Sequence, residues 1–474
     1  MPNFIDYYEF SKLANAAYVD LDTDLSGTTI ATAVNDAERL PIALAEQTFS
    51  SSTTPVWAVS EGGFYGNDDE GFAATLFERG SEKVLAIRGT EPSFDLSGDL
   101  LKADLAQIGF LGLAMGQALS MVNFIRRLQA PVSDENVQQL TWNYSQIEPT
   151  EPSIPLGDGK GFIYFTELPE ATGLELIAPS EKITVTGHSL GGHLAVLAAR
   201  LFPGLINDCY AFNAPGFDPD TANVIFTAAS FTKPILMAIV KTIMIVENVA
   251  FLTGGTLKIT DEFVDLIGSY LPEIPATSFS QVSIHNLESE DIDPGDDASG
   301  VASLLTGAHN LPAEIFIPTE RNSHMIEPFM DSLSMQAVLY RLKPDITTGE
   351  IENLFRAVST SNGNVLEKLV VMLRNTLVTD TPAIPNLSKI ADAFDETVSG
   401  AILHIGTGDI EARREYYPVL LEVENAVKSN PKLYLEILVG KSTGELVGLA
   451  KGSSPDAQAY FYALTELNPF AITV

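Results

Sequence analysis

Hydrophobic and polar positions along the first 345 residues alternate between short apolar runs and longer amphipathic stretches. Three short runs, rich in β-branched or aromatic residues, end in glycine-containing turns at Lys83–Thr90, Lys182–Ser189 and Cys209–Gly216. The longer stretches have helical spacing and lie at Leu100–Leu128, Gly191–Leu201 and Ile326–Leu342. Buried strands that alternate with helices form parallel sheets covered by helices, so the pattern predicts an α/β fold with a mostly parallel sheet.

Beyond about residue 345 the pattern changes. Helical segments are separated there by polar breaks such as PDITTG and KGSSPD, and no further convincing strand pair is evident. We therefore expect a sheet-containing domain at 1–345 and a helical C-terminal region at 346–474. Its last helix should begin at Pro455, with Ser454 as the N-cap, and end at Asn468-Pro469.

The most apolar part of the chain lies in a long interval between two predicted strands, at about 218–280. Its core, Asn223–Leu257, is interrupted by charged residues and a proline before it reaches the ~18 uncharged residues that a bilayer span needs. We therefore expect buried or lipid-facing helix and no transmembrane segment. The N-terminus has no basic region followed by a long apolar run, so a cleavable Sec signal peptide is not expected.

The excess of acidic over basic side chains limits the kinds of molecule that the chain is expected to bind. The chain of 474 residues has 62 acidic and 27 basic side chains and a formal net charge of −35, so we expect no nucleic acid as partner, because a polyanion would be repelled. Hydrophobic residues make up 45% of the chain, too many for a disordered protein. Its single cysteine, Cys209, excludes an intrachain disulfide and thiolate-based metal clusters.

The sequence Gly187-His188-Ser189-Leu190-Gly191 follows a predicted strand and precedes a predicted helix. A serine on such a tight strand-to-helix turn is a nucleophile elbow, which holds the hydroxyl clear of the backbone. Glycines are needed on both sides because a Cβ there would collide with the neighbouring strand and helix. The pattern predicts Ser189 as a nucleophile, with the Leu190 amide at the helix start as an oxyanion donor.

A second G-x-S-x-G copy, Gly440–Gly444, serves as an internal control. No histidine follows it in the sequence, so the nucleophile–acid–histidine order cannot be completed from it. We interpret it as a turn.

A serine nucleophile requires a histidine base, and the chain has six histidines. His188 and His193 belong to the elbow, His285 precedes every candidate acid, and His404 lies in the C-terminal region. His309 and His324 remain. We favour His324 because it stands in a polar loop directly before the amphipathic helix at Ile326–Leu342, where this kind of fold places its base.

The acid that orients the base should lie in the loop after the strand Val282–Leu287. Several carboxylates follow that strand. We choose Asp291, and Asp293 and Glu288 remain alternatives. The second oxyanion donor should come from the turn after an earlier strand, where Gly89 permits close backbone approach and Thr90 presents its amide.

Four segments, in order, resemble the signature of class 3 lipases, a family of α/β-hydrolases. They are IRGT at Ile87–Thr90, TGHSLGG at Thr186–Gly192, FNAPGF at Phe212–Phe217 and SEDIDPG at Ser289–Gly295. The likeness covers roughly residues 1–345 and is greatest to calcium-dependent bacterial lipases exported by type I secretion. It implies Ser189 as nucleophile, Asp291 as acid, His324 as base, and Thr90 and Leu190 as oxyanion donors.

The resemblance implies a triacylglycerol lipase that works at a lipid–water interface through an acyl-serine intermediate. The alternatives are a phospholipase A1 with the same triad, and a non-catalytic hydrolase-fold module of a larger secreted protein. The chemistry needs no organic cofactor, and a structural calcium ion is compatible with the likeness. The insertion at 218–280, and the stretch Leu105–Phe124, are candidates for a helical lid or for core helix.

The resemblance also implies a location. Type I export uses no cleavable Sec signal, so we expect a secreted, extracellular protein. The segment Ala459–Val474 resembles the part of large secreted bacterial proteins that precedes calcium-binding repeats. We therefore expect the chain to be the amino-terminal portion of a longer protein.

Overall fold

The computed structural model describes most of the chain, and the statements below concern the described residues. These are 3–21, 27–52, 55–66, 68, 71–89, 115–151, 153–155, 161–168, 171–216, 282–292, 314–319, 324–359, 364–378, 381–384, 386–390, 394–398, 401–405 and 409–474. The predicted insertion at 218–280 and the first ten residues of the second lid candidate lie outside them.

A seven-stranded sheet forms the centre of the fold, in the order β1-β2-β3-β7-β8-β9-β10. Its strands are β1 (Ala58–Tyr65), β2 (Ala74–Arg79), β3 (Glu82–Ile87), β7 (Ile183–His188), β8 (Ile206–Phe212), β9 (Ser283–Asp291) and β10 (Glu314–Thr319). β1, β2 and β3 pair antiparallel, and from β3 to β10 every pairing is parallel. The predicted strands at the glycine-containing turns are therefore confirmed as β3, β7 and β8.

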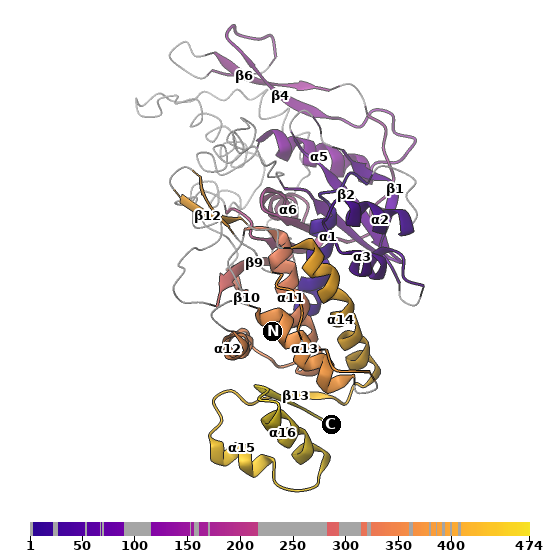
Figure 1. Ribbon diagram of the computed structural model, residues 1–474. Helices are drawn as coiled ribbons and strands as arrows, with labels where there is room; N and C mark the ends of the chain where they lie inside the picture. Colours follow the sequence, from indigo (N-terminus) through magenta and orange to yellow (C-terminus); the bar gives the residue numbers. More distant parts are fainter. Residues whose placement is uncertain are drawn as a thin grey trace.

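Helices cover both faces of this sheet (Figure 1). One face carries α1 (Phe4–Ala16) and α11 (Ile326–Leu342), and the other carries α5 (Met115–Gln129) and α6 (Leu190–Leu201). Alternation along each strand explains the two cores: in β3, Val84 packs on the α1 side and Leu85 on the α6 side, and both are fully buried. The predicted α/β-hydrolase fold is confirmed by this architecture.

The described part of the second lid candidate belongs to α5. Met121 and Phe124 are buried in the core on the α6 side of the sheet, so this part of the candidate is core helix. A separate antiparallel sheet lies beyond α5 and consists of β4 (Leu140–Ser145), β5 (Ser153–Pro155) and β6 (Phe162–Glu167). Figure 1 shows β4 and β6 at the end of the molecule opposite α15 and α16.

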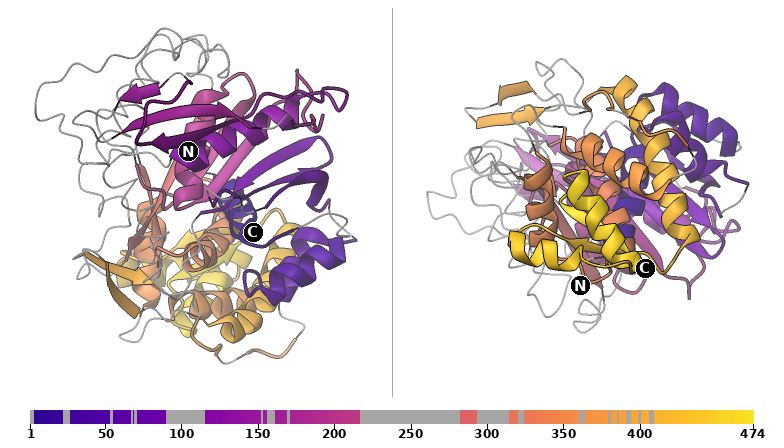
Figure 2. Two further views of the ribbon diagram at one scale, coloured as in Figure 1. Left: turned by 90° about the horizontal axis from the view of Figure 1, so that it is seen from above. Right: turned by 60° about the horizontal axis from the view of Figure 1, so that its bottom comes forward.

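The C-terminal region is mainly helical but also contains two strand pairs, which corrects the expectation that no further pair exists. Its elements are α12 (Thr348–Val358), α13 (Val365–Leu377), β11 (Phe394–Val398), β12 (Ala401–Ile405), α14 (Ile410–Ser429), β13 (Tyr434–Ile437), α15 (Thr443–Leu449), α16 (Pro455–Thr465) and β14 (Phe470–Thr473). β13 pairs antiparallel with β14. The helices α15 and α16, which separate these strands in the sequence, are drawn in yellow in Figure 2 (right). Pairing across so long an interval leaves no local hairpin signal.

The last helix begins as predicted, because the Ser454 side chain accepts a hydrogen bond from the Ala457 amide. It ends at Thr465, three residues before the predicted stop at Asn468-Pro469.

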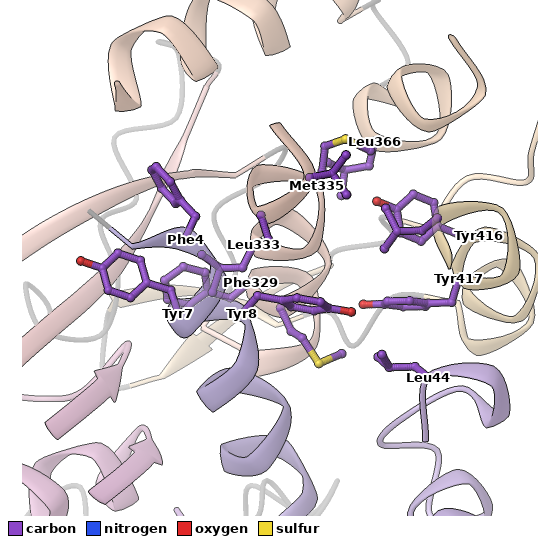
Figure 3. Close-up of a cluster of buried hydrophobic side chains, with 14 of the residues drawn as sticks. Phe4, Tyr7, Tyr8, Leu44, Phe329, Leu333, Met335, Leu366, Tyr416 and Tyr417 are labelled. Carbon is purple, nitrogen blue, oxygen red and sulfur yellow. The ribbon is translucent and has the colours of Figure 1, made fainter. Parts of the chain in front are cut away.

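The C-terminal helices share a hydrophobic core with the N-terminal ones, α1, α2 (Gly27–Asp36) and α3 (Ile42–Phe49). Figure 3 shows Tyr416 and Tyr417 of α14 beside Tyr8 of α1 and close to Leu44 of α3. All four side chains are buried in one cluster with Phe329 of α11. The predicted domain boundary at residue 345 falls in the turn between α11 and α12, and this core extends across it.

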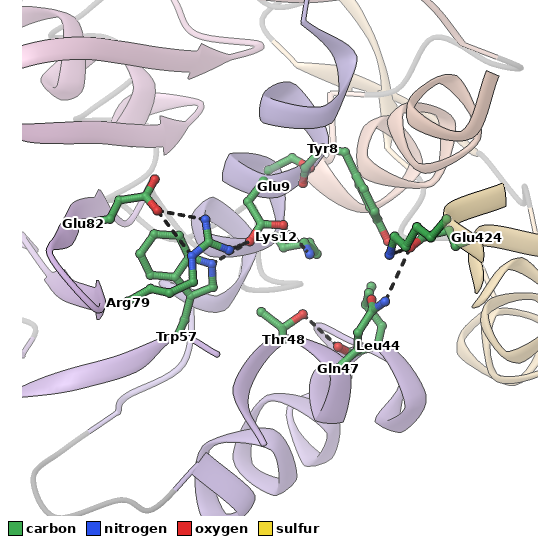
Figure 4. A network of polar contacts seen from close by, with 12 residues as sticks. Tyr8, Glu9, Lys12, Leu44, Gln47, Thr48, Trp57, Arg79, Glu82 and Glu424 are labelled. Carbon is green, nitrogen blue, oxygen red and sulfur yellow. Dashed lines mark hydrogen bonds and ion pairs between the residues drawn. The ribbon is translucent and has the colours of Figure 1, made fainter. Parts of the chain in front are cut away.

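A half-buried carboxylate, that of Glu9, ties α1 to the antiparallel edge of the sheet (Figure 4). Glu9 accepts hydrogen bonds from Trp57 Nε1 at 2.7 Å and from an Arg79 guanidinium nitrogen at 2.5 Å, and it pairs with Lys12 at 2.7 Å. Burial opposes its ionisation, but the two cations outweigh burial and lower the pKa of Glu9 to about 2. The N-terminal helix is thereby fixed against the sheet on which the candidate site stands.

Candidate active site

Ser189 stands on the turn between β7 and α6 in a backbone conformation that non-glycine residues rarely adopt. Its φ is 55° and its ψ is −130°, a strained geometry that the surrounding structure must impose. Its amide donates to the Phe212 carbonyl at 2.9 Å, and its own carbonyl accepts from the Gly192 amide at 2.9 Å. Both ends of the serine are therefore held by the backbone, as a nucleophile elbow requires.

The glycines around the serine have the steric role predicted for them. A Cβ on Gly187 would lie 2.3 Å from the Gly191 carbonyl oxygen, and one on Gly191 would lie 2.1 Å from the Ile87 carbonyl oxygen. These neighbours are main-chain atoms of packed elements, which cannot move aside at low cost. The turn can therefore form only with hydrogen at both positions.

Gly191→Ala is expected to destabilise the fold by about 3 kcal/mol, the upper end of the cost of overpacking, because the new methyl group meets backbone. The control is Gly444→Ala, in the second G-x-S-x-G copy, where a Cβ has nothing within 4 Å. That variant should be neutral or more stable by up to about 1 kcal/mol. Urea unfolding of both variants measures the difference, and equal midpoints would contradict the steric account.

His324 reaches the serine hydroxyl. Its Nε2 lies 2.9 Å from Ser189 Oγ, and the residue directly precedes Met325, the N-cap of α11. Burial lowers the pKa of His324 well below its usual value, and the nearby His188 lowers it further. The imidazole is therefore neutral near pH 7, so Nε2 can accept the serine proton.

Three further residues belong to this site, and sequence reasoning did not assign them a role in it. His188 Nε2 lies 2.6 Å from the carbonyl oxygen of His324, and Asn213 Nδ2 donates to the same oxygen at 3.2 Å. The Tyr18 hydroxyl lies 2.8 Å from His188 Nδ1. His188 and Asn213 stand within the segments TGHSLGG and FNAPGF, but their contacts join residues more than 100 positions apart.

The predicted oxyanion donors differ in how far the structure describes them. Leu190 is the first residue of α6, so its amide has no acceptor within the helix and points to the outside of its N-terminal end. Thr90 lies outside the described residues, but Gly89 before it is described. A Cβ on Gly89 would lie 3.4 Å from Ser189 Cβ, so the turn after β3 reaches Ser189.

Among the described residues, no predicted acid is placed beside the His324 imidazole. Asp291 is the last residue of β9 and pairs with Thr319 of β10, and its side chain is outside the described part. Asp293 is outside it as well, and Glu288 is buried within β9. His324 Nδ1 is buried and has no hydrogen-bond partner among the described residues.

The carboxylates from Glu288 to Asp291 stand within a strand, which corrects the expectation of a loop after Leu287. The parallel pairing of β10 with β9 extends as far as Thr319 and Asp291 and so keeps this segment extended. Asp291 is thereby placed at the carboxyl edge of the sheet, where the elbow after β7 also lies.

The remaining histidines have other surroundings or are not described. His285 stacks on Tyr210 with ring centroids 4.5 Å apart, and His193 Nδ1 lies 3.2 Å from the Pro215 carbonyl oxygen. His404 stands in β12, and His309 lies outside the described residues. In the second G-x-S-x-G copy Gly440 lies in a turn, as interpreted, and Ser442 is the N-cap of α15 in a capping box with Glu445.

The described residues were also searched for metal-binding groups and for helices that could span a membrane. Within them, no group of three or more histidine, cysteine, aspartate or glutamate side chains is arranged to hold a metal ion. None of the helices in these ranges combines the length and apolar character that crossing a bilayer requires.

Comparison with known proteins adds nothing to the argument from the structure. No protein-family model and no curated protein matches the chain. Among solved structures the chain is similar to the Lip2 lipase of Yarrowia lipolytica, with 13% sequence identity and a TM-score of 0.24, over 66% of this chain and 78% of that chain. A TM-score this low supports no conclusion about the site, which therefore stands on its own geometry.

Proposed function

We propose that the chain is a serine hydrolase of carboxylic esters. One observation carries the proposal: Ser189 Oγ lies 2.9 Å from His324 Nε2 on a strained strand-to-helix turn. A buried, neutral imidazole beside a serine hydroxyl is the arrangement that activates oxygen for attack on a carbonyl carbon. A structural Ser-Gly turn would need neither the strain nor the imidazole.

The reaction follows from these positions. Ser189 Oγ attacks the ester carbonyl carbon while its proton passes to His324 Nε2, and the amide of Leu190 donates to the oxyanion that forms. Collapse of the tetrahedral intermediate breaks the bond to the alcohol, which leaves with the proton from His324. A water molecule, deprotonated by the same imidazole, then releases the carboxylic acid and restores the serine.

Two further parts complete this proposal. Asp291 would accept a hydrogen bond from His324 Nδ1, the buried nitrogen without a described partner, and stabilise the imidazolium. The amide of Thr90 would be the second oxyanion donor, supported by the closeness of Gly89 to Ser189. Each assignment concerns groups beyond the described residues.

For the substrate we propose a long-chain triacylglycerol, in keeping with the resemblance to class 3 lipases. The formal net charge of −35 disfavours anionic lipid surfaces and is compatible with a neutral lipid. Secretion, and a structural calcium ion, are parts of the same proposal. No step of the chemistry is assigned to calcium.

Fatty-acid release from three substrates tests the proposal: a triolein emulsion, phosphatidylcholine vesicles and soluble p-nitrophenyl butyrate. We expect hydrolysis of triolein and of the soluble ester, with Ser189→Ala as the inactive control. Release mainly from phosphatidylcholine would change the substrate to that of a phospholipase A1. An absence of hydrolysis with all three would contradict the proposed chemistry.

A further inference from the structure

The carbonyl oxygen of His324, a residue outside the helices and strands, receives two side-chain donors. His188 Nε2 lies at 2.6 Å and Asn213 Nδ2 at 3.2 Å from it. Both side chains are buried, with exposed fractions of 3% and 0%. The main chain of the base is therefore fixed from β7 and from the segment after β8, and not from its own helix.

The contacts determine which nitrogen of His188 carries its proton. A carbonyl oxygen can only accept, so His188 Nε2 must donate to the His324 carbonyl. Nδ1 is then the unprotonated nitrogen and accepts from the Tyr18 hydroxyl at 2.8 Å. Burial lowers the pKa of His188 to about 4, so the ring is neutral near pH 7, in agreement with this tautomer.

The residues behind His188 are themselves held in place. The Arg39 guanidinium lies over the Tyr18 ring, 4.6 Å from its centroid, and pairs at 3.0 Å with Glu327 in the first turn of α11. Asn213 Oδ1 accepts from the Ser289 amide of β9 at 2.9 Å. The contacts thus join α11, which follows the base, to the strands that carry the nucleophile.

His188, the neighbour of Ser189 in the sequence, is thus one of the two groups that hold the main chain of His324, and it makes the shorter contact. Ser189 and His188 are consecutive at the end of β7, and their rigid backbone sets the distance between Oγ and the His324 carbonyl. A displacement of about 1 Å in a catalytic group can lower a rate by about 100-fold.

We propose that His188 is a positioning residue for the base: its Nε2–H holds the His324 carbonyl and thereby keeps the His324 imidazole within reach of Ser189 Oγ. This inference rests on the proposed ester hydrolysis and adds to it a residue that touches neither substrate nor serine oxygen. The orientation of His188 is set by Tyr18.

Two substitutions of similar size separate the donor function of His188 from its packing. His188→Gln places an amide donor near the position of Nε2, whereas His188→Asn can still accept from Tyr18 but does not reach the His324 carbonyl. With p-nitrophenyl butyrate we expect His188→Asn to lower kcat by about 10- to 100-fold with KM changed less than about twofold. His188→Gln should stay within about fivefold of the wild type.

Two more variants complete the design. Tyr18→Phe removes the hydrogen bond that orients His188 and should lower kcat by about fivefold, the equivalent of one hydrogen bond. It keeps the test decisive if His188→Asn does not fold. His285→Asn makes the same substitution at a histidine that stacks on Tyr210 and should leave kcat unchanged.

The outcomes distinguish this inference from the proposed function. If the wild type hydrolyses no ester, both are overturned. If the wild type is active, and folded His188→Asn or Tyr18→Phe retains its kcat, the proposed function stands and the positioning role is overturned. An equal loss of kcat in His188→Gln and His188→Asn would also overturn it, because packing alone would then explain the effect.

Discussion

Ser189→Ala and His324→Ala are each expected to lower kcat for ester hydrolysis by about 10⁴- to 10⁶-fold. The double variant should be no worse than either single one, because the two side chains act as one unit through the contact between Oγ and Nε2 at 2.9 Å. Initial rates with p-nitrophenyl butyrate measure all three variants. The folded state is checked by circular dichroism.

Ser442→Ala is the matched control, since it changes the serine of the second G-x-S-x-G copy. Ser442 caps α15 through the Glu445 amide, so its loss should cost about 1 kcal/mol of stability and leave kcat unchanged. If Ser189→Ala kept more than a tenth of the wild-type rate, the assignment of the nucleophile would be wrong.

The largest expected effect on stability concerns an ion pair between α14 and α11. Arg413 pairs with Asp331 at 2.7 Å, both side chains are 1% exposed, and the Tyr417 hydroxyl donates to the same carboxylate at 2.8 Å. Arg413→Leu leaves a buried carboxylate without its cation and is expected to lower the free energy of unfolding by about 3–5 kcal/mol.

The neighbouring arginine provides the comparison for that variant. Arg414 pairs with Glu411 on the exposed side of α14, and Arg414→Leu should change the free energy of unfolding by less than about 1 kcal/mol. Urea denaturation of both variants gives the two values. A cost for Arg413→Leu as small as that for Arg414→Leu would show that the buried ion pair contributes little to holding α14 against α11.

The sequence pattern was sufficient to predict those elements whose structure depends mainly on residues close by in the chain. The strand before Ser189, the helix after it and the helix at Ile326–Leu342 all follow from periodicity and from glycine placement. The closeness of His324 to Ser189 could also be anticipated, because the fold places its base after the last strand of the sheet. In these cases neighbouring residues determine the structure.

The features that the sequence did not reveal depend on partners distant in the chain. β9 extends over the carboxylate residues as far as Asp291 because β10 pairs with it. β13 pairs with β14, from which two helices separate it in the sequence. The contacts of His188 with Tyr18 and with the His324 carbonyl join positions 170 and 136 residues apart. No periodicity or motif signals such contacts, since they arise only when the sheet has formed.

The choice of acid could not be made from sequence for a different reason. Several carboxylates lie close together after Leu287, and each is chemically able to orient an imidazole. Spacing does not distinguish them, because a single residue of register decides which carboxylate lies at the sheet edge.

Covalent labelling by a fluorophosphonate tests most directly whether Ser189 is an activated nucleophile. The reagent forms a phosphonyl ester with an activated serine oxygen and releases fluoride, so peptide mass spectrometry locates the modified residue. We expect one label, on Ser189, lost in Ser189→Ala and slowed by at least about 1,000-fold in His324→Ala. A folded wild-type protein that takes no label, or takes it at another serine, would contradict the account and favour a non-catalytic module with a hydrolase fold.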